Sequence, residues 1–484
     1  MDSQLILVCL ISYFALLFVV SMLTSRGANN DTYFRANKSS KWYLVAFGMI
    51  GASLSGVTFI SVPGWVNNSQ FAYMQMVLGY LPGYMLIAFV LMPLYYRLKL
   101  TTIYTYLGER FGLVSYKTGS AFFLVSRLLG SALRMFLIVD VLQTLVFNDL
   151  NVPFPVTVIG SILLVWLYTF RGGMKTIVWT DTLQTAFMLI AVISTVILIA
   201  QHMGWGLGEA VRQISESDYS QVFFWGEGKS NFFKQFLSGA LIALCMTGLD
   251  QDMMQKNLTC KNIKEAQWNM SSFAVVLVFV NLLFLGLGVM LYLYAAKIGV
   301  SETGDQLYAA VVKSGTLPTV VGIFFVLGLT AAAYSSADSA MTALTTSFCY
   351  DMLDLEKKPQ EQQEKIRRIV HIGFAALTIL VILGAKQLDN KNIIDTVFKV
   401  ASYTYGPLLG FFAFGLFTKR PVTDSWAPAI AITAPLLSYV LASNSKVWFS
   451  GFEFGYEILL VNGALTWFGL WLSGFTRSMD PEVS

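Results

Sequence analysis

The sequence predicts an all-α polytopic membrane protein with thirteen transmembrane helices and a core of two inverted five-helix repeats. Three observations predict it: the composition, the spacing of apolar segments, and the side on which basic residues collect. Of the 484 residues, 56% are hydrophobic and only 12% are charged, whereas about 25% are charged in ordinary globular proteins. The mean hydropathy is +0.62. Such a chain crosses the bilayer many times and leaves no room for a large domain outside it.

Thirteen apolar segments, separated by charged or Gly- and Pro-rich breaks, account for most of the chain. The first has Asp2 and no Lys or Arg before it, and no small-residue cleavage site after it, so we expect a retained helix and not a signal peptide. The approximate limits of the segments are 5–23, 42–65, 71–96, 121–147, 156–170, 176–200, 236–254, 273–295, 320–347, 370–385, 393–417, 427–441 and 458–471.

Lys and Arg residues collect in alternate loops. One set of loops contains 21 of the 32 basic residues, Lys256 among them, and the other set contains 8. Because basic loops remain in the cytoplasm, this bias predicts an external N-terminus and a cytoplasmic C-terminus. An odd number of spans also requires termini on opposite sides of the membrane.

The second to sixth segments make one group of five helices, and the seventh to eleventh make another. Because five is odd, the second group enters the membrane from the opposite side, as in the inverted repeats of secondary transporters, which bind substrate near the bilayer midplane. The predicted parts are 1–40, the first helix and a cytoplasmic loop; 41–201, the first repeat; 202–232, an external loop; 233–417, the second repeat; and 418–484, two C-terminal helices.

The leading helix of each repeat contains residues that favour an interruption. The first has Gly and hydroxyl residues over 48–58, and the second has Gly248 followed by Asp250, Gln251 and Asp252 at a similar depth. Small residues also permit close helix packing, and for 48–58 alone that explanation is equally good. The matching positions in both repeats favour two broken helices.

Eight ionisable residues fall within or at the ends of the segments, where an unpaired charge costs at least about 2.5 kcal/mol at the bilayer centre. The two arginines among them share a helix face, and pairing with Asp140 or another acid explains them better than substrate binding. Lys399 needs a partner, either Asp250, Asp252 or an anionic substrate. Asp181 is either a first-turn acid favoured by the helix dipole or part of a cation site. The eight are Arg127, Arg134, Asp140, Asp181, Asp250, Asp252, Asp338 and Lys399.

The ninth segment contains a Ser-rich stretch with helical spacing. Ala332, Ser335 and Ser336 lie at i, i+3 and i+4, and Ser335, Asp338 and Ser339 repeat this spacing one turn later. Oxygen atoms stacked along one face suit Na⁺, and carbonyl groups of an unwound neighbouring helix can complete its shell. The alternative is that these serines bond to carbonyls of their own helix and pack closely.

In their order and depth, these motifs resemble the sodium:solute symporter family. That family includes the bacterial sodium-coupled galactose, proline and sialic acid transporters and has the LeuT-like fold. The resemblance covers essentially the whole chain. The residues that carry it are 51–63 (GASLSGVTFISVP), Trp179-Thr180-Asp181, Gly248 to Gln251 with Gln255-Lys256 and Glu265-Ala266, and Ala332 with Ser335 and Ser336.

The resemblance implies one or two bound Na⁺ ions. The second site occurs in some members, including the sialic acid transporters, which have a serine where this chain has Asp338. That difference leaves open a sodium site, a proton site, or a pair between Asp338 and a buried cation. The first implied site consists of the backbone carbonyls of Gly51, Leu54 and Ala332 with the hydroxyls of Ser335 and Ser336; the second consists of Asp181, Ser335, Asp338 and Ser339.

The resemblance also implies a substrate site beside the broken helices. Ser53, Ser55 and Thr58 match hydroxyls that hold a carboxylate in the sialic acid branch, but the arginine of that branch aligns nearer Ser131 than either arginine here. A lysine that the galactose transporters use has no counterpart in 275–280. The implied substrate-binding residues are Ser53, Ser55, Thr58, Met76, Val77, Tyr80, Asp250, Gln251 and Lys399.

The function implied is sodium-coupled symport of a small polar solute across a bacterial inner membrane by alternating access. A sugar acid such as sialic acid is favoured over a neutral sugar. The alternatives are proton coupling, amino-acid symport, a channel and a transporter-like sensor. We expect no enzyme, because the two His and four Cys residues lack metal-ligand spacing. We also expect a monomer whose partners are the lipid bilayer and the solute, with no nucleic acid.

Overall fold

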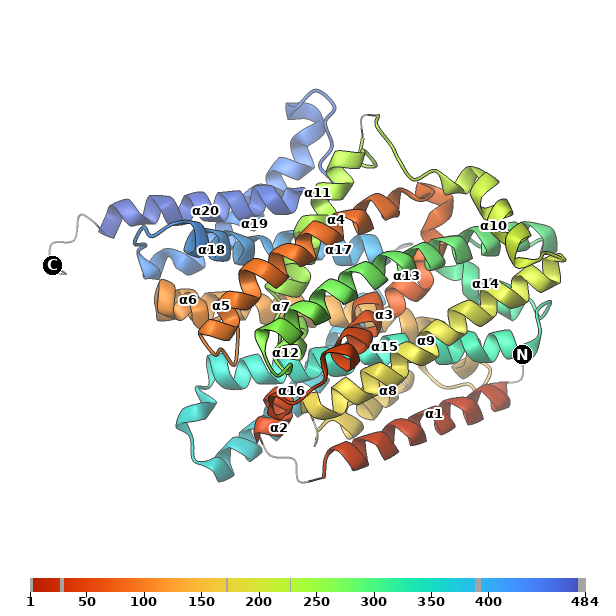
Figure 1. The fold of residues 1–484 in the computed structure, drawn as a ribbon, viewed down its shortest axis with the longest axis horizontal. Coiled ribbons are helices and arrows are strands. Elements are labelled where there is room, and N and C mark those ends of the chain that lie inside the picture. Colours follow the sequence, from red (N-terminus) through yellow and green to blue (C-terminus); the bar gives the residue numbers. More distant parts are fainter. Residues whose placement is uncertain (1–2, 27–29, 171–172, 227, 388–392, 478–484) are drawn as a thin grey trace.

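A computed structural model describes residues 3–26, 30–170, 173–226, 228–387 and 393–477. Throughout these ranges the regular structure is helical, and the single β-bridge pairs Ser40 with Cys260. Figure 1 shows one bundle of helices, with α1 (Ser3–Thr24) along one side and the last two, α19 (Ala427–Trp448) and α20 (Ile458–Arg477), on the opposite side. The predicted all-α class is confirmed.

The first repeat contains five membrane helices, and π-helical turns extend two of them. Two short helices, α2 (Asn30–Arg35) and α6 (Thr105–Arg110), lie in its connections. The membrane helices are α3 (Trp42–Ser69), α4 (Ala72–Leu86) continued by η2 (Ile87–Leu91) and α5 (Met92–Arg97), α7 (Leu113–Leu142) with η3 (Gln143–Phe147), α8 (Phe154–Thr169) and α9 (Gly173–Met203).

The second repeat follows α10 (Leu207–Glu216) and has the same number of membrane elements. A connecting segment with η6 (Gly304–Gln306) and α14 (Leu307–Lys313) joins two of its helices. The membrane elements are α11 (Phe232–Ala243) with η5 (Leu244–Gly248) and α12 (Gln251–Asn257), α13 (Ile263–Ile298), α15 (Thr319–Ser347) with η7 (Phe348–Met352), α16 (Gln360–Ala385), and α17 (Ile393–Thr404) with α18 (Gly406–Phe417).

Every predicted segment overlaps one of these helices. Ten helices in the described ranges are long and apolar enough to cross a membrane, and two bent pairs raise the number to twelve. The segment predicted at 156–170 forms α8, a shorter apolar helix. The total of thirteen spans therefore remains a prediction, whereas a multi-pass helical protein is established.

Both leading helices are broken, as the sequence predicts. In α3 the backbone of Ser55 leaves helical geometry, with φ of 47° and ψ of 170°. In the second repeat, the chain bends by 69° between Phe232–Gly248 and Gln251–Asn257. The positive φ of Ser55 is uncommon for a residue with a side chain and frees nearby backbone groups from the helix ladder.

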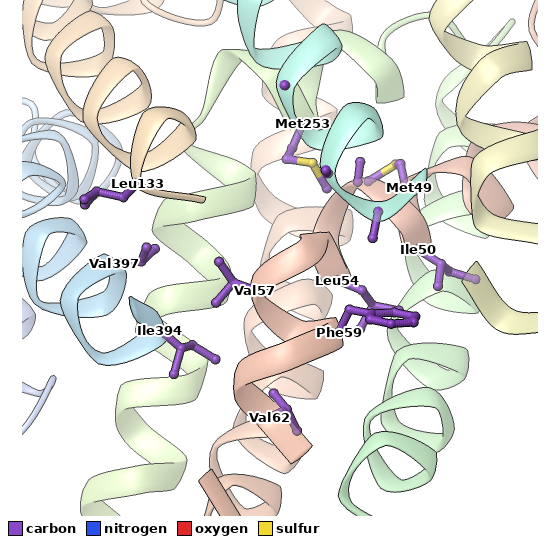
Figure 2. Packing of buried hydrophobic residues seen from close by; sticks show 14 of the residues in the cluster. Met49, Ile50, Leu54, Val57, Phe59, Val62, Leu133, Met253, Ile394 and Val397 are labelled. Atoms are coloured by element: carbon purple, nitrogen blue, oxygen red, sulfur yellow. The ribbon is translucent and has the colours of Figure 1, made fainter. Parts of the chain in front are cut away.

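The break in α3 lies inside the packed core. Figure 2 shows Val57 on the side of α3 that faces Ile394 and Val397 of α17, whereas Leu54 and Phe59 lie on the opposite side. The helix α15 packs against α3, α7 and α9. Because α3 presents glycines to α9, a Cβ on Gly48 would lie 3.0 Å from the Cβ of Asp181. The three helices α3, α9 and α15 therefore meet closely at one level.

Candidate ion and substrate site

A cavity of about 70 Å³ lies beside the break in α3. Its walls come from both broken helices and from α4, α7, α13 and α17. Of the predicted substrate residues, Ser53, Ser55, Thr58 and Tyr80 line it. Typical small-molecule sites enclose about 300 Å³ or more, so the pocket has to widen before it can hold a sugar-sized solute.

The charged side chains in the described cavity wall are both arginines. Arg127 and Arg134 both line it, and none of its described lining residues is Asp or Glu. Nη1 of Arg134 is 3.5 Å from the hydroxyl of Ser336, at the limit of a hydrogen bond. Arg134 forms no ion pair within the described part of the chain. Its charge therefore faces the cavity unneutralised, and the predicted pair with Asp140 is not present.

Arg127, two helical turns away, is paired with two acids. Its guanidinium forms a close ion pair with Asp252 and lies 3.8 Å from Asp250. Asp250 accepts a hydrogen bond from the hydroxyl of Tyr405. The carboxylate of Asp250 also caps α12, because it accepts from the backbone N–H groups of Asp252 at 2.9 Å and Met253 at 3.3 Å. For Arg127, the predicted internal pairing is confirmed.

The Ser-rich face of α15 meets α9 and α12. The hydroxyl of Ser335 donates to Asp181 at 2.6 Å, and the hydroxyl of Ser339 lies 3.0 Å from the carbonyl of Ser335 and 3.3 Å from Asp252. Asp338 accepts from the hydroxyl of Tyr168 at 2.9 Å. The structure therefore brings together all four residues of the implied second cation site.

Lys256 lies in the same cluster, which corrects its assignment to a cytoplasmic loop. It belongs to α12, is 1% exposed, and its ammonium is 2.7 Å from the carboxylate of Asp181. Asp252 and Asp338 are close enough to interact with it electrostatically. Its burial is possible because these acids supply the compensating charge.

The implied first sodium site spans α3 and α15, which pack against each other. Leu54 lines the cavity, and the backbone N–H of Gly51 donates to Thr185 of α9 at 3.1 Å. Ser336 is reached by Arg134, which lines the same cavity. Ala332 is 1% exposed, one turn before Ser336. The helices that carry these groups meet at the break in α3.

Several predicted substrate residues lie elsewhere. Lys399 points away from the cavity, because its side chain is 62% exposed and pairs with Asp395 at 2.5 Å, so its predicted pairing with Asp250 or Asp252 is wrong. Gln251 bonds to the chain after α5: it accepts from the N–H of Ile103 at 2.9 Å and donates to the carbonyl of Thr101 at 3.0 Å.

Three other predicted residues also contribute no wall to the cavity. Met76 and Val77 are fully buried but are not among its lining residues. Asp250 belongs instead to the ion-pair network of Arg127. Met76 lies where α4 packs against α11, with its backbone carbonyl against Gly239.

Sequence reasoning missed four uncharged polar residues of the cavity wall, one of which is Thr247 of η5. Tyr73 and Tyr84 line it with Tyr80, and the hydroxyls of Tyr73 and Tyr80 are 3.1 Å apart. Asn281 lines it from α13, where it is the single amide in a long apolar run. A buried amide within an apolar membrane helix is a recognisable signal of function.

The chain matches one protein family over most of its length. The model of the "Sodium:solute symporter family" matches residues 33–427. The sodium/sialic acid symporter NanT of Aliivibrio fischeri is 22% identical over 473 residues, which cover 95% of this chain and 92% of that protein. The sodium/sialic acid symporter SiaT of Proteus mirabilis is 23% identical, covering 93% of this chain and 92% of that one.

A solved structure confirms the fold. The substrate-bound, outward-open structure of a Na⁺-coupled sialic acid symporter has a TM-score of 0.81 to this chain, with 19% identity. The match covers 97% of this chain and 98% of that one. The protein therefore has the LeuT-like fold that the family resemblance implied, and it belongs to the sodium:solute symporter family of membrane transporters.

Proposed function

We propose that this protein is a sodium-driven importer of a small organic anion in the inner membrane, with sugar acids such as sialic acid as the first candidates. The observation that carries the proposal is the unpaired guanidinium of Arg134 at the cavity. An arginine binds a carboxylate through two parallel hydrogen bonds. Ser53, Ser55 and Thr58 supply hydroxyl donors around the same space.

The position of Arg134 also supports a mechanism for coupling. Its guanidinium contacts the hydroxyl of Ser336, which is a ligand of the proposed first sodium site. A cation at that site is repelled by Arg134 until an anionic substrate neutralises the arginine. Substrate and Na⁺ then raise each other's affinity reciprocally, and couplings of this kind typically amount to about 1–3 kcal/mol.

The proposed Na⁺ site consists of the carbonyls of Gly51, Leu54 and Ala332 with the hydroxyls of Ser335 and Ser336. One Na⁺ entering along a membrane potential releases about 2.3 kcal/mol per 100 mV. A tenfold concentration gradient adds roughly 1.4 kcal/mol. One ion is therefore enough to drive substantial accumulation of substrate.

Alternating access requires a barrier that opens and closes, and the buried network of Arg127 supports one. This network joins α7, the start of α12 and the bend between α17 and α18, on the side of the cavity toward the loops that the basic residues assign to the cytoplasm. It consists of Arg127, Asp250, Asp252 and Tyr405. We propose that the repeats 41–201 and 233–417 move against each other when this network opens. A single chain surrounds the whole cavity, which supports a monomeric transporter.

The test is the melting temperature of the purified protein with sialic acid, other sugar acids, neutral sugars, amino acids and simple carboxylates, each in NaCl and in choline chloride. We expect anions to stabilise the protein, and only when Na⁺ is present, because ligands that bind the folded state raise its stability. Stabilisation by neutral sugars alone would contradict the proposal that the substrate is an anion. Equal stabilisation in choline chloride would overturn sodium coupling.

A further inference from the structure

We propose that the ammonium of Lys256 occupies the position of a second sodium ion, so that this transporter binds one Na⁺. The inference rests on the proposed first sodium site, because that site is the one that remains. It concerns the four groups that the family resemblance assigns to a second ion: Asp181, Ser335, Asp338 and Ser339.

The contacts of Asp181 support the proposal. One of its carboxylate oxygens lies 2.7 Å from Nζ of Lys256, and the other accepts from the hydroxyl of Ser335 at 2.6 Å. Both residues of the pair are almost completely buried, with Lys256 and Asp181 each 1% exposed. Each carboxylate oxygen of Asp181 therefore already faces a partner, the ammonium of Lys256 on one side and the hydroxyl of Ser335 on the other.

The ammonium of Lys256 supplies positive charge to two of the proposed ion ligands, Asp181 and Asp338. Asp252 and Asp338 also interact electrostatically with Lys256, and Asp252 is paired on its other side with Arg127. A Na⁺ that shared Asp181 with Lys256 would lie within a few ångströms of another full positive charge in a buried region, where repulsion is strong. The lysine supplies the charge that a second Na⁺ would bring.

The location of Lys256 gives this arrangement a consequence for the transport cycle. Lys256 lies on α12, the part of the broken helix that follows the 69° bend. Its ammonium is therefore tethered to the chain and is not released to the cytoplasm with the substrate. The second cation position then contributes structure and no driving force.

The proposal is tested by counting bound ions with ²²Na⁺ at equilibrium on the full-length protein in lipid nanodiscs. We expect the natural protein to saturate at one Na⁺ per chain, without cooperativity. Lys256→Met removes the ammonium and frees the carboxylate oxygen of Asp181 that faces it, so this variant should saturate at two. Lys256→Arg keeps a cation at the position and should remain at one. The double variant Lys256→Met/Asp181→Asn removes the acid and should also remain at one.

Two Na⁺ ions on the natural protein would overturn the inference, and so would a folded Lys256→Met variant that binds only one. If Lys256→Met fails to fold, the count on the natural protein decides alone. A natural protein that binds no Na⁺ would overturn the proposed sodium symport, and this inference with it. Failure of this inference and failure of the proposed sodium symport are therefore distinguishable, because only the second gives a natural protein that binds no Na⁺.

Discussion

Arg127 and Arg134 lie on the same face of α7, about 10.5 Å apart along the helix, yet their surroundings are opposite. Arg127 is 4% exposed and is bound by two carboxylates. Arg134 faces a cavity and touches a single hydroxyl. The difference comes from the start of α12, because Asp250 and Asp252 form direct ion pairs with the first arginine and, among the described residues, not with the second.

The two surroundings suggest two different roles. Where each buried charge has an internal partner, as in the cluster of Arg127, Lys256 and their acids, the charges hold helices together. Where a charge has none, a ligand can supply the missing partner, and complementary charge then selects the ligand. Four changes test this contrast, beginning with the largest expected effect.

Replacing Arg127 with Met should destabilise the protein by about 3–5 kcal/mol, because it leaves Asp250 and Asp252 as uncompensated buried charges. The measurement is the apparent melting temperature of the purified variant, followed by size-exclusion chromatography. The matched control is Arg134→Met, on the same helix, which should melt close to the natural protein. Equal losses in both variants would remove the distinction between the two arginines.

Asp305, in η6, is a buried acid that forms no ion pair with the described residues, and it tests what such burial costs. It is 6% exposed and accepts from the N–H of Ile393 at 3.1 Å, and burial raises its pKa to about 6. Its pKa in the unfolded chain is about 3.9. The folded protein therefore binds the proton of Asp305 more tightly than the unfolded chain does. The resulting contribution to folding stability is complete below about pH 4 and is lost as the pH rises to about 6.

Through this group the free energy of unfolding should fall by up to about 3 kcal/mol between pH 4 and pH 7, because the folded and unfolded pKa values of Asp305 differ by roughly two. Asp305→Asn should remove this part of the pH dependence of the melting temperature and leave the rest. The measurement is the melting temperature of both proteins across that range. Parallel curves would show that Asp305 does not titrate in this interval.

Replacing Arg134 with Gln should weaken binding of sialic acid by about 2 kcal/mol, roughly 30-fold, because a charge-assisted hydrogen-bonding pair is lost. Titration calorimetry in saturating NaCl measures this. Arg134→Lys keeps the charge but not the forked geometry, so it should recover only part of the affinity. An unchanged affinity in Arg134→Gln would place the carboxylate elsewhere.

Replacing Ser336 with Ala should raise the Na⁺ concentration needed for half-maximal uptake roughly fivefold. The reason is that the loss of one ion ligand weakens Na⁺ binding by about 1 kcal/mol. Uptake into proteoliposomes at varied NaCl measures this effect. Ser438→Ala on α19, whose buried hydroxyl bonds only within its own helix at 2.8 Å, serves as a control. A Ser335→Ala/Ser336→Ala variant with unchanged sodium dependence would remove the site assignment.

The sequence predicts well what depends on local pattern. Long apolar runs locate the helices, and the Gly and hydroxyl residues around Ser55 and Gly248 locate both breaks, because a helix loses support where such residues cluster. The spacing of the serines on α15 likewise indicates a polar face. Asp181 lies against that face at Ser335, as its inclusion in the same cation site requires.

What the sequence cannot predict depends on the direction of short elements. Lys256 follows the bend by a few residues and reads as a loop cation, but α12 has only seven residues and turns back into the protein. Lys399 lies within an apolar segment, yet its side chain faces outward beside Asp395. For Lys256 the basic-residue pattern misses a short buried helix, and for Lys399 hydropathy leaves the exposed face of the helix undetermined.

The two hydrogen bonds of Gln251 to residues 101–103 have a practical consequence. They fasten α12 to a connecting segment that begins beside the exposed Lys99. If α12 moves, either this segment moves with it or both hydrogen bonds break. An antibody fragment raised against the surface around Lys99 would immobilise the segment and arrest turnover from a distance, without competing for the solute.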